Sequence, residues 1–176
     1  LGLNHERAEL CVRVTRAALA SNAKRYRLAT SVFAVAVETA IASDLAHDAL
    51  RHLECAGMAP DVVLEVGQDD CGHWTIREND NVVTTPGSLD GVVPAIKQVM
   101  RLRAIDLHPF LLNIHAGVVS FGDGCVLLTA SSGRGKTTLT AALVHAGASY
   151  FSDEVALLDE GTLAVRPVPL SFTVKD

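Results

Sequence analysis

The sequence contains no pair of cysteines at metal-binding spacing, no long apolar run and no excess of basic residues. Its four cysteines lie far apart, which excludes a zinc ribbon or a thioredoxin-type motif and favours a reducing, cytoplasmic location. The longest apolar stretch, residues 28–37, is shorter than the roughly 20 residues that span a bilayer, so we expect no membrane partner. A net charge of −5 argues against nucleic acid as a partner.

Two local groups of polar residues are assigned no function from the sequence. Cys71 and His73 flank a single glycine and could both bind a metal, but two ligands do not make a site and no matching pair lies elsewhere in the sequence. Lys97, Arg101 and Arg103 form a basic group, which we interpret as a solvated helix face or turn edge.

The most informative segment of the sequence is A-S-S-G-R-G-K-T, residues 130–137, between a strand-like run and a helix-like run. Gly133 and Gly135 let the backbone curl so that successive N–H groups face phosphate oxygens. Lys136 can reach the outer phosphates of a nucleotide, and the Thr137 hydroxyl can bind Mg²⁺. The segment therefore predicts a phosphate-binding loop for ATP and Mg²⁺, although Ala130 replaces the first glycine of that motif. The expected nucleotide-binding residues are Ser132, Gly133, Arg134, Gly135, Lys136, Thr137 and Thr138.

Hydrophobic periodicity predicts an α/β (α+β) fold in two parts. Residues 1–88 form a small N-terminal α+β region of unknown role, and residues 89–176 form a phosphate-loop core of mixed β-sheet flanked by helices. The strands between residues 61 and 84 should form an antiparallel meander, and Gly122-Asp123-Gly124 should form a hairpin turn. We expect helices over residues 6–22, 43–53, 91–107 and 138–146, and strands over residues 28–37, 61–66, 73–77, 82–84, 114–121, 125–129, 150–152 and 155–158.

The expected loop needs an acidic partner, because Mg²⁺ keeps an octahedral oxygen shell and rarely binds through one hydroxyl alone. The pair Asp153-Glu154 follows the strand that should lie beside the loop strand, so it is the preferred candidate. A second pair, Asp159-Glu160, ends an apolar run, but the following Gly161 favours a surface turn. His115 lies in an apolar run one hairpin upstream, where a lone histidine is more often structural than functional.

The residues from His115 to Leu158 resemble the HPr kinase/phosphorylase-like family, whose nucleotide fold is shared with phosphoenolpyruvate carboxykinase. The resemblance rests on H-A-G-V-V, G-D-G-C-V-L-L-T-A-S-S-G-R-G-K-T-T-L and H-A-G-A-S-Y-F-S-D-E-V-A-L-L. His115 lies 21 residues before Lys136, and Asp153 lies 17 residues after it, as in that family. The similarity extends from about residue 107 to residue 172 and is closer in style to the divergent branches that modify a peptide or a free amino acid.

The resemblance implies transfer of the γ-phosphate of ATP to a hydroxyl, typically of serine, in a peptide, protein or small metabolite. Asp153 would be the base that receives the hydroxyl proton, and His115 would hydrogen-bond near it to tune that carboxylate. Glu154, with Thr137 and Asp153, would hold Mg²⁺, and Lys136 would neutralise charge on the transferred group.

The sequence departs from the family at three points, one of which is Ala130 in place of the first glycine of the loop. Glu154 stands where the family has a second aspartate. Family members also continue past the position of Asp176 into a region with a basic transition-state contact and the acceptor site, so we expect a longer chain, a homo-oligomer or a partner chain to supply these groups. The alternative function is a catalytically silent nucleotide-binding regulatory or assembly module. A transporter-type ATPase subunit is a third possibility, but the sequence has no L-S-G-G-Q-like segment.

Overall fold

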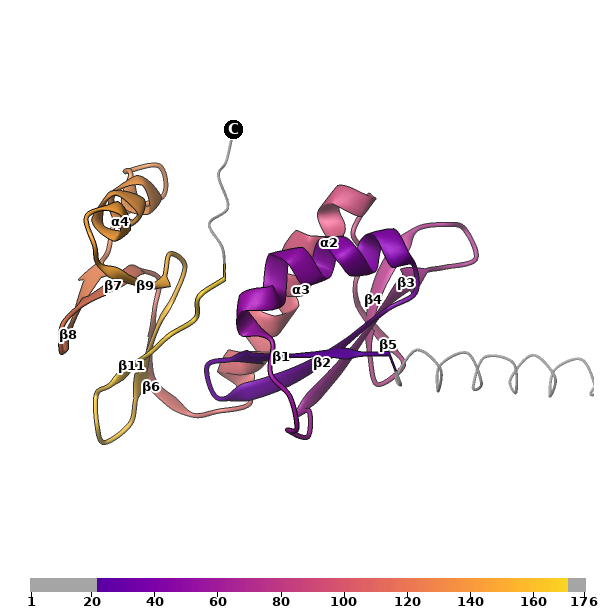
Figure 1. The fold of residues 1–176 in the computed structure, drawn as a ribbon, viewed down its shortest axis with the longest axis horizontal. Coiled ribbons are helices and arrows are strands. Elements are labelled where there is room, and N and C mark those ends of the chain that lie inside the picture. Colours follow the sequence, from indigo (N-terminus) through magenta and orange to yellow (C-terminus); the bar gives the residue numbers. More distant parts are fainter. Residues whose placement is uncertain (1–21, 171–176) are drawn as a thin grey trace, which may run out of the picture. The chain divides into compact units, whose positions relative to one another are not determined.

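The structure, a computed structural model, describes residues 22–170 and divides into two compact units (Figure 1). The helix expected over residues 6–22 lies almost wholly outside the described residues. The division between the two units falls inside one long helix, between Val99 and Met100. The boundary expected from the sequence lies earlier, between residues 88 and 89. Of the described residues, unit 1 contains 22–27 and 32–99, and unit 2 contains 28–31 and 100–170.

Unit 1 is built on a five-stranded sheet in the order β1-β2-β3-β4-β5. Strands β2 and β3 are parallel, whereas β3, β4 and β5 form the expected antiparallel meander. The strand expected over residues 28–37 is divided, because Ala29, with φ of 53°, turns the chain between β1 and β2. The elements are β1 (Lys24–Leu28), β2 (Ser31–Val37), α2 (Ala40–Leu50), a 3₁₀ turn (Arg51–Leu53), β3 (Val62–Gln68), β4 (Trp74–Glu78), β5 (Asn81–Thr84) and α3 (Leu89–Asp106).

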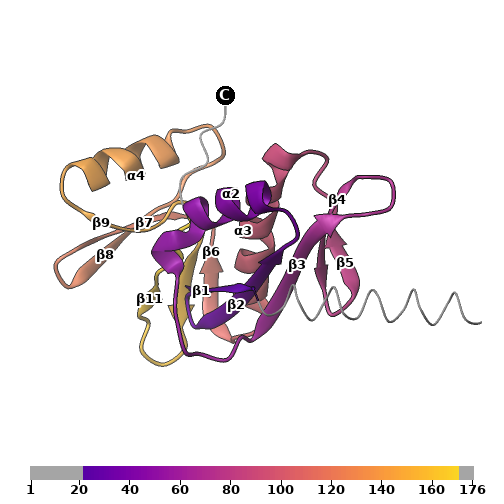
Figure 2. The same ribbon diagram turned by 45° about the vertical axis from the view of Figure 1, so that its right-hand side comes forward.

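The crossover from β2 through α2 to β3 follows from local sequence. Apart from its last residue, β2 is buried at every position, as its run of small and β-branched side chains favours. The Thr39 hydroxyl then caps α2 by accepting a hydrogen bond from the Ala42 N–H at 3.4 Å. Helix α2 buries Ala42, Ala46 and Leu50, which share one face, and it lies beside α3 against the sheet in both views (Figures 1 and 2).

Unit 2 contains two three-stranded antiparallel sheets, β11-β10-β6 and β8-β7-β9, together with helix α4. The sheets share a core around Ala116, Val118 and Ala156. The described chain is thus a mixed α+β fold, with its parallel strand pair in unit 1. None of the helices within residues 22–170 is long and apolar enough to cross a membrane. The elements are β6 (Phe110–Ile114), β7 (Gly117–Phe121), β8 (Gly124–Leu128), α4 (Lys136–His145), β9 (Ser149–Ser152), β10 (Ala156–Asp159) and β11 (Val165–Arg166).

The single strand expected over residues 114–121 is wrong, because the chain changes sheets in its middle. Ile114, at the end of β6, pairs with Ala156 in one sheet, and Gly117, at the start of β7, pairs with Leu128 in the other. His115 therefore lies on the connection between the two strands. Residues on both sides of His115 pack against the same core, which gives the sequence there a largely apolar pattern that looks like one strand.

The buried face of α4 also differs from the expected one. The sequence predicts Leu139, Ala142, Leu143 and Ala146 as core positions, but Leu139 is 49% exposed and only Leu143 of the four is even half-buried. Thr140 is fully buried instead, against Gly117 of β7. A polar side chain can occupy this face because the Thr140 hydroxyl donates to the Lys136 carbonyl at 2.9 Å.

Replacement of Gly117 by alanine should destabilise the protein by about 1–3 kcal/mol, because a Cβ there would collide with the Thr140 hydroxyl. The Gly117→Ala/Thr140→Ala double variant should lose less stability than the sum of the two single variants. Urea unfolding measures both effects. Gly124→Ala on β8 is the control, since its nearest neighbouring atom lies 3.8 Å away. Equal losses for the two alanine variants would contradict the close approach of α4 to β7.

Candidate functional site

Three chain segments meet at one edge of the β8-β7-β9 sheet. Strand β7 is antiparallel to both neighbours, so β8 and β9 run in the same direction and both end beside the start of β7. Leu128 and Ser152, the last residues of β8 and β9, pair with Gly117 and Val118. The glycine loop and the acidic pair therefore lie at the same edge of this sheet. The expectation from the sequence that β9 lies directly beside the loop strand β8 is wrong, since β7 lies between them.

The loop after β8 has the backbone shape that its glycines allow. Gly133 and Gly135 both have φ of 78°, a left-handed conformation that side-chain-bearing residues rarely adopt. The turn is closed by a hydrogen bond from the Arg134 N–H to the Ser131 carbonyl at 3.3 Å. Residues 130–135 are exposed, and α4 begins directly after Gly135. The first turn of a helix carries N–H groups without intrahelical acceptors, which is a favourable setting for an anion.

His115 connects the loop to the acidic pair. Its ring Nδ1 lies 2.7 Å from the Glu154 carbonyl oxygen, and its Nε2 lies 2.6 Å from Lys136 Nζ. A carbonyl oxygen can only accept and an ammonium can only donate, so the ring must carry its proton on Nδ1 and accept from Lys136 at Nε2. His115 therefore holds the Lys136 ammonium beside the acidic turn. The side chain is 60% exposed, so the contact is open to solvent.

Glu154 is bound on its carboxylate side by an arginine that the sequence analysis assigned to a solvated surface. Arg101 donates to Glu154 Oε2 at 2.8 Å, and the Arg101 side chain is only 25% exposed. The backbone of the acidic turn is also fixed, because the buried Ser152 hydroxyl accepts hydrogen bonds from the N–H groups of Glu154 and Val155 at 3.2 and 3.1 Å. The Arg101 contact uses Oε2 and not Oε1 of Glu154.

Asp153 differs from Glu154 in being almost completely buried, with 6% exposure. The Tyr150 hydroxyl lies 2.8 Å from Asp153 Oδ1 and 2.6 Å from the Leu170 carbonyl oxygen. Burial raises the pKa of Asp153, the Tyr150 hydrogen bond partly offsets this rise, and the negative charge of Glu154 adds to it. Burial also raises the pKa of Tyr150 far above its usual range, which keeps its phenol protonated.

The Tyr150 phenol has one proton and two acceptors. It can donate to the Leu170 carbonyl and still satisfy Asp153 only if the carboxyl group itself carries a proton and donates to the phenol oxygen. Alternatively, the phenol donates its proton to an ionised Asp153, and the Leu170 carbonyl then receives no hydrogen bond from Tyr150. The arrangement therefore accommodates both charge states of Asp153. Their interconversion requires Asp153 to gain or lose a proton, and the Tyr150 hydroxyl hydrogen then rotates from one acceptor to the other.

The structure brings together several of the catalytic and metal-binding candidates. His115, Lys136 and Glu154 are joined by hydrogen bonds. The two ring nitrogens of His115 contact the Glu154 carbonyl, one residue after Asp153, and Lys136, so its expected tuning of the Asp153 carboxylate stays a prediction. Of the remaining candidates, Ser132, Gly133, Arg134 and Gly135 lie in the exposed loop, and Thr137 and Thr138 lie in the first turn of α4.

Two contributors were missed from the sequence, namely Arg101 and Tyr150. Arg101 lies 53 residues from Glu154, and no local pattern indicates such a pair. Tyr150 is three residues before Asp153, a spacing that places side chains on opposite faces of a continuous strand. They meet because the strand ends at Ser152 and the chain turns.

The raised pKa of Asp153 predicts a pH-dependent effect of Asp153→Asn on stability. A buried carboxyl group that binds its proton more tightly when folded stabilises the protein below its unfolded pKa, near 3.8, and this contribution is lost as the pH rises through the folded value. Asp153→Asn should therefore gain stability relative to wild type as the pH rises from 4 toward neutrality. Urea unfolding across this range measures it, with the exposed Asp123→Asn as control. A pH-independent difference would contradict the assignment.

Comparisons with protein-family models, with curated proteins and with solved structures found no match. The resemblance to the HPr kinase/phosphorylase-like family stays a prediction that rests on sequence motifs. The function of the site must therefore be inferred from the geometry at the edge of the β8-β7-β9 sheet.

Proposed function

We propose that the protein is an ATP- and Mg²⁺-dependent phosphotransferase that moves the γ-phosphate to a serine-type hydroxyl of a peptide, protein or small metabolite. The observation that carries the proposal is the meeting of a left-handed glycine loop, the Lys136 ammonium and two carboxylates at one sheet edge. Phosphoryl transfer needs positioning and charge compensation more than covalent chemistry, and these groups supply both.

The residues at this edge fit a nucleotide and its metal. The loop of residues 130–135 and the start of α4 offer backbone N–H groups to phosphate oxygens, and Lys136 adds a positive charge. Mg²⁺ prefers oxygen ligands, which the Thr137 hydroxyl, Glu154 Oε1 and the Asp153 carboxylate would supply. A bound Mg²⁺ would neutralise charge on the phosphates.

His115 acts on Lys136 rather than on the acceptor. Its Nε2 accepts from the Lys136 ammonium while its Nδ1–H is held by the Glu154 carbonyl, so the flexible lysine side chain is restrained before a nucleotide binds. Restraint of this kind lowers the entropy that is lost when the ammonium meets a phosphate. In this proposal His115 is a positioning residue.

Asp153 is the residue best suited to accept the hydroxyl proton of the acceptor. Burial makes its carboxylate a stronger base than an ordinary aspartate, and Lys136 opposes this by favouring the charged form. The Tyr150 hydroxyl fixes the direction of Oδ1. The remaining carboxylate oxygen can then face the acceptor or the metal.

The alternative function is a nucleotide-binding regulatory or assembly module without transfer. It is favoured by the fact that both carboxylates already have protein partners, Arg101 for Glu154 and Tyr150 for Asp153. In such a module the loop and Lys136 would bind the nucleotide, and the acidic turn would be a structural support.

Asp153→Asn distinguishes the two functions. In a phosphotransferase, loss of the base should reduce transfer by about 10²–10⁴-fold and leave ATP affinity nearly unchanged. ATP binding is measured by calorimetry with and without Mg²⁺, and transfer by ADP release in the presence of serine or a serine-containing peptide. Asp123→Asn, at the opposite end of the β7–β8 hairpin, is the matched control. Binding without ADP release in the wild-type protein would favour the regulatory module.

Lys136→Ala should weaken ATP binding by about ten- to a hundredfold under either function, because a charged hydrogen bond to phosphate is lost. The same calorimetric titration measures the change. Lys24→Ala, on β1 of unit 1, is the control and should bind ATP as the wild-type protein does. Unchanged affinity in Lys136→Ala would overturn the assignment of the loop as a phosphate-binding site.

A further inference from the structure

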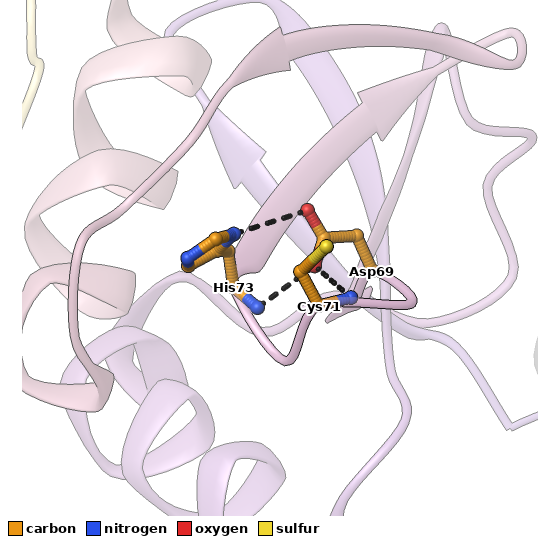
Figure 3. Close-up of side chains that lie close together, drawn as sticks. All are labelled: Asp69, Cys71 and His73. Carbon is orange, nitrogen blue, oxygen red and sulfur yellow. Dashed lines mark hydrogen bonds and ion pairs between the residues drawn. The ribbon is translucent and has the colours of Figure 1, made fainter.

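The turn between β3 and β4 places three different metal-binding side chains together in unit 1. Asp69, Cys71 and His73 each offer one ligand atom, and these atoms all lie within 4.8 Å of one another (Figure 3). The sequence alone shows only the Cys71 and His73 pair as potential ligands. The backbone turn adds Asp69 as the third ligand, so the objection that two ligands do not make a site no longer applies.

The turn is shaped by the carboxylate of Asp69. One oxygen, Oδ1, accepts hydrogen bonds from the N–H groups of Cys71 and His73, both at 2.9 Å. The other oxygen, Oδ2, lies 3.5 Å from His73 Nδ1 (Figure 3). Gly72, with φ of 81°, allows the chain to return toward β4.

One of the separations between ligand atoms agrees with tetrahedral coordination. Zinc binds nitrogen and oxygen at about 2.0–2.2 Å and sulfur at about 2.3 Å, so two ligands of one tetrahedral ion lie about 3.3–3.8 Å apart. The separation of Asp69 Oδ2 and His73 Nδ1 is already 3.5 Å. The remaining separations, which stay within 4.8 Å, require only side-chain rotation of an exposed cysteine and an exposed histidine.

We propose that Asp69 Oδ2, Cys71 Sγ and His73 Nδ1 form a site for a zinc-type divalent cation, with a fourth position open to water or to an external ligand. A thiolate and an imidazole select borderline-soft metals over Mg²⁺ and Ca²⁺, which prefer oxygen ligands only. Cys71 releases its thiol proton to solvent when the metal–sulfur bond forms. This site lies in unit 1 and does not depend on the proposed phosphotransfer.

The turn is anchored well enough to present these ligands. Gln68 and Trp74, which flank the turn, are paired across the β3–β4 ladder. The Gln68 N–H donates to Glu38 Oε2 at 3.1 Å, and its side-chain amide donates to the Gly72 carbonyl at 3.1 Å. The backbone between the ligands is therefore positioned before a metal binds, which lowers the cost of ordering them.

Titration of the full chain with Co²⁺, followed by displacement with Zn²⁺, tests the site. We expect one equivalent of Co²⁺ to bind with a thiolate-to-metal charge-transfer band and with the intense visible absorption of tetrahedral cobalt, and Zn²⁺ to remove both signals. Cys71→Ser should abolish the charge-transfer band, and His73→Gln should weaken binding by about tenfold or more. Asp69→Asn, which keeps an oxygen for both backbone N–H groups, should weaken it similarly without loss of the turn.

Cys125→Ser is the matched control, because Cys125 is also an exposed free cysteine but lies on β8 of unit 2. This variant should retain the complete cobalt spectrum. The proposal is overturned if the wild-type chain binds no cobalt with a sulfur band, or if Cys71→Ser keeps that band. Circular dichroism of each variant shows that a loss of binding is not a loss of fold.

Discussion

The antiparallel pairing of β7 with both of its neighbours is the constraint on which the candidate site depends. Because β8 and β9 must then run in the same direction, the chain leaves both strands at the edge where β7 begins. Residues far apart in the sequence are brought together without any long-range pairing between β8 and β9. Gly117 contributes a second condition, since the lack of a side chain there lets α4 approach β7 and places Lys136 at the same edge.

Side-chain contacts divide the two neighbouring carboxylates into different environments. Glu154 is half-buried. Arg101 binds its carboxylate, and His115 contacts both its carbonyl oxygen and Lys136. Asp153 turns inward to Tyr150, where burial disfavours its charge. A buried acid whose charge is disfavoured and a neighbouring acid whose carboxylate is bound by an arginine are suited to different tasks, one to exchange a proton and one to hold a cation. Asp153 and Glu154 look equivalent in the sequence, but their different surroundings suit them to different chemistry.

Features governed by local backbone chemistry were predictable from the sequence. The left-handed glycines of the loop, the hairpin at Gly122-Asp123-Gly124 and the break between the strands at residues 153–154 each have a local signal, and the structure has all three. The change of sheets at His115 could not be predicted from the sequence, because the residues before and after His115 pack against the same core. The buried face of α4 was misjudged because apolar periodicity cannot foresee a threonine that satisfies its hydroxyl within the helix. The role of Arg101 could not be predicted, because its contact with Glu154 joins residues 53 positions apart in the sequence.

The two candidate sites show how the side chains in a turn decide the sign of the charge that it can bind. In the β3–β4 turn, Asp69 takes two backbone N–H groups with one oxygen, so the turn presents a carboxylate, a thiol and an imidazole outward and suits a cation. The loop of residues 130–135 contains no acidic side chain, and it leads into a helix N-terminus with Lys136 as first residue. No carboxylate within the loop competes for its N–H groups, so the same kind of strand-end turn suits a phosphate.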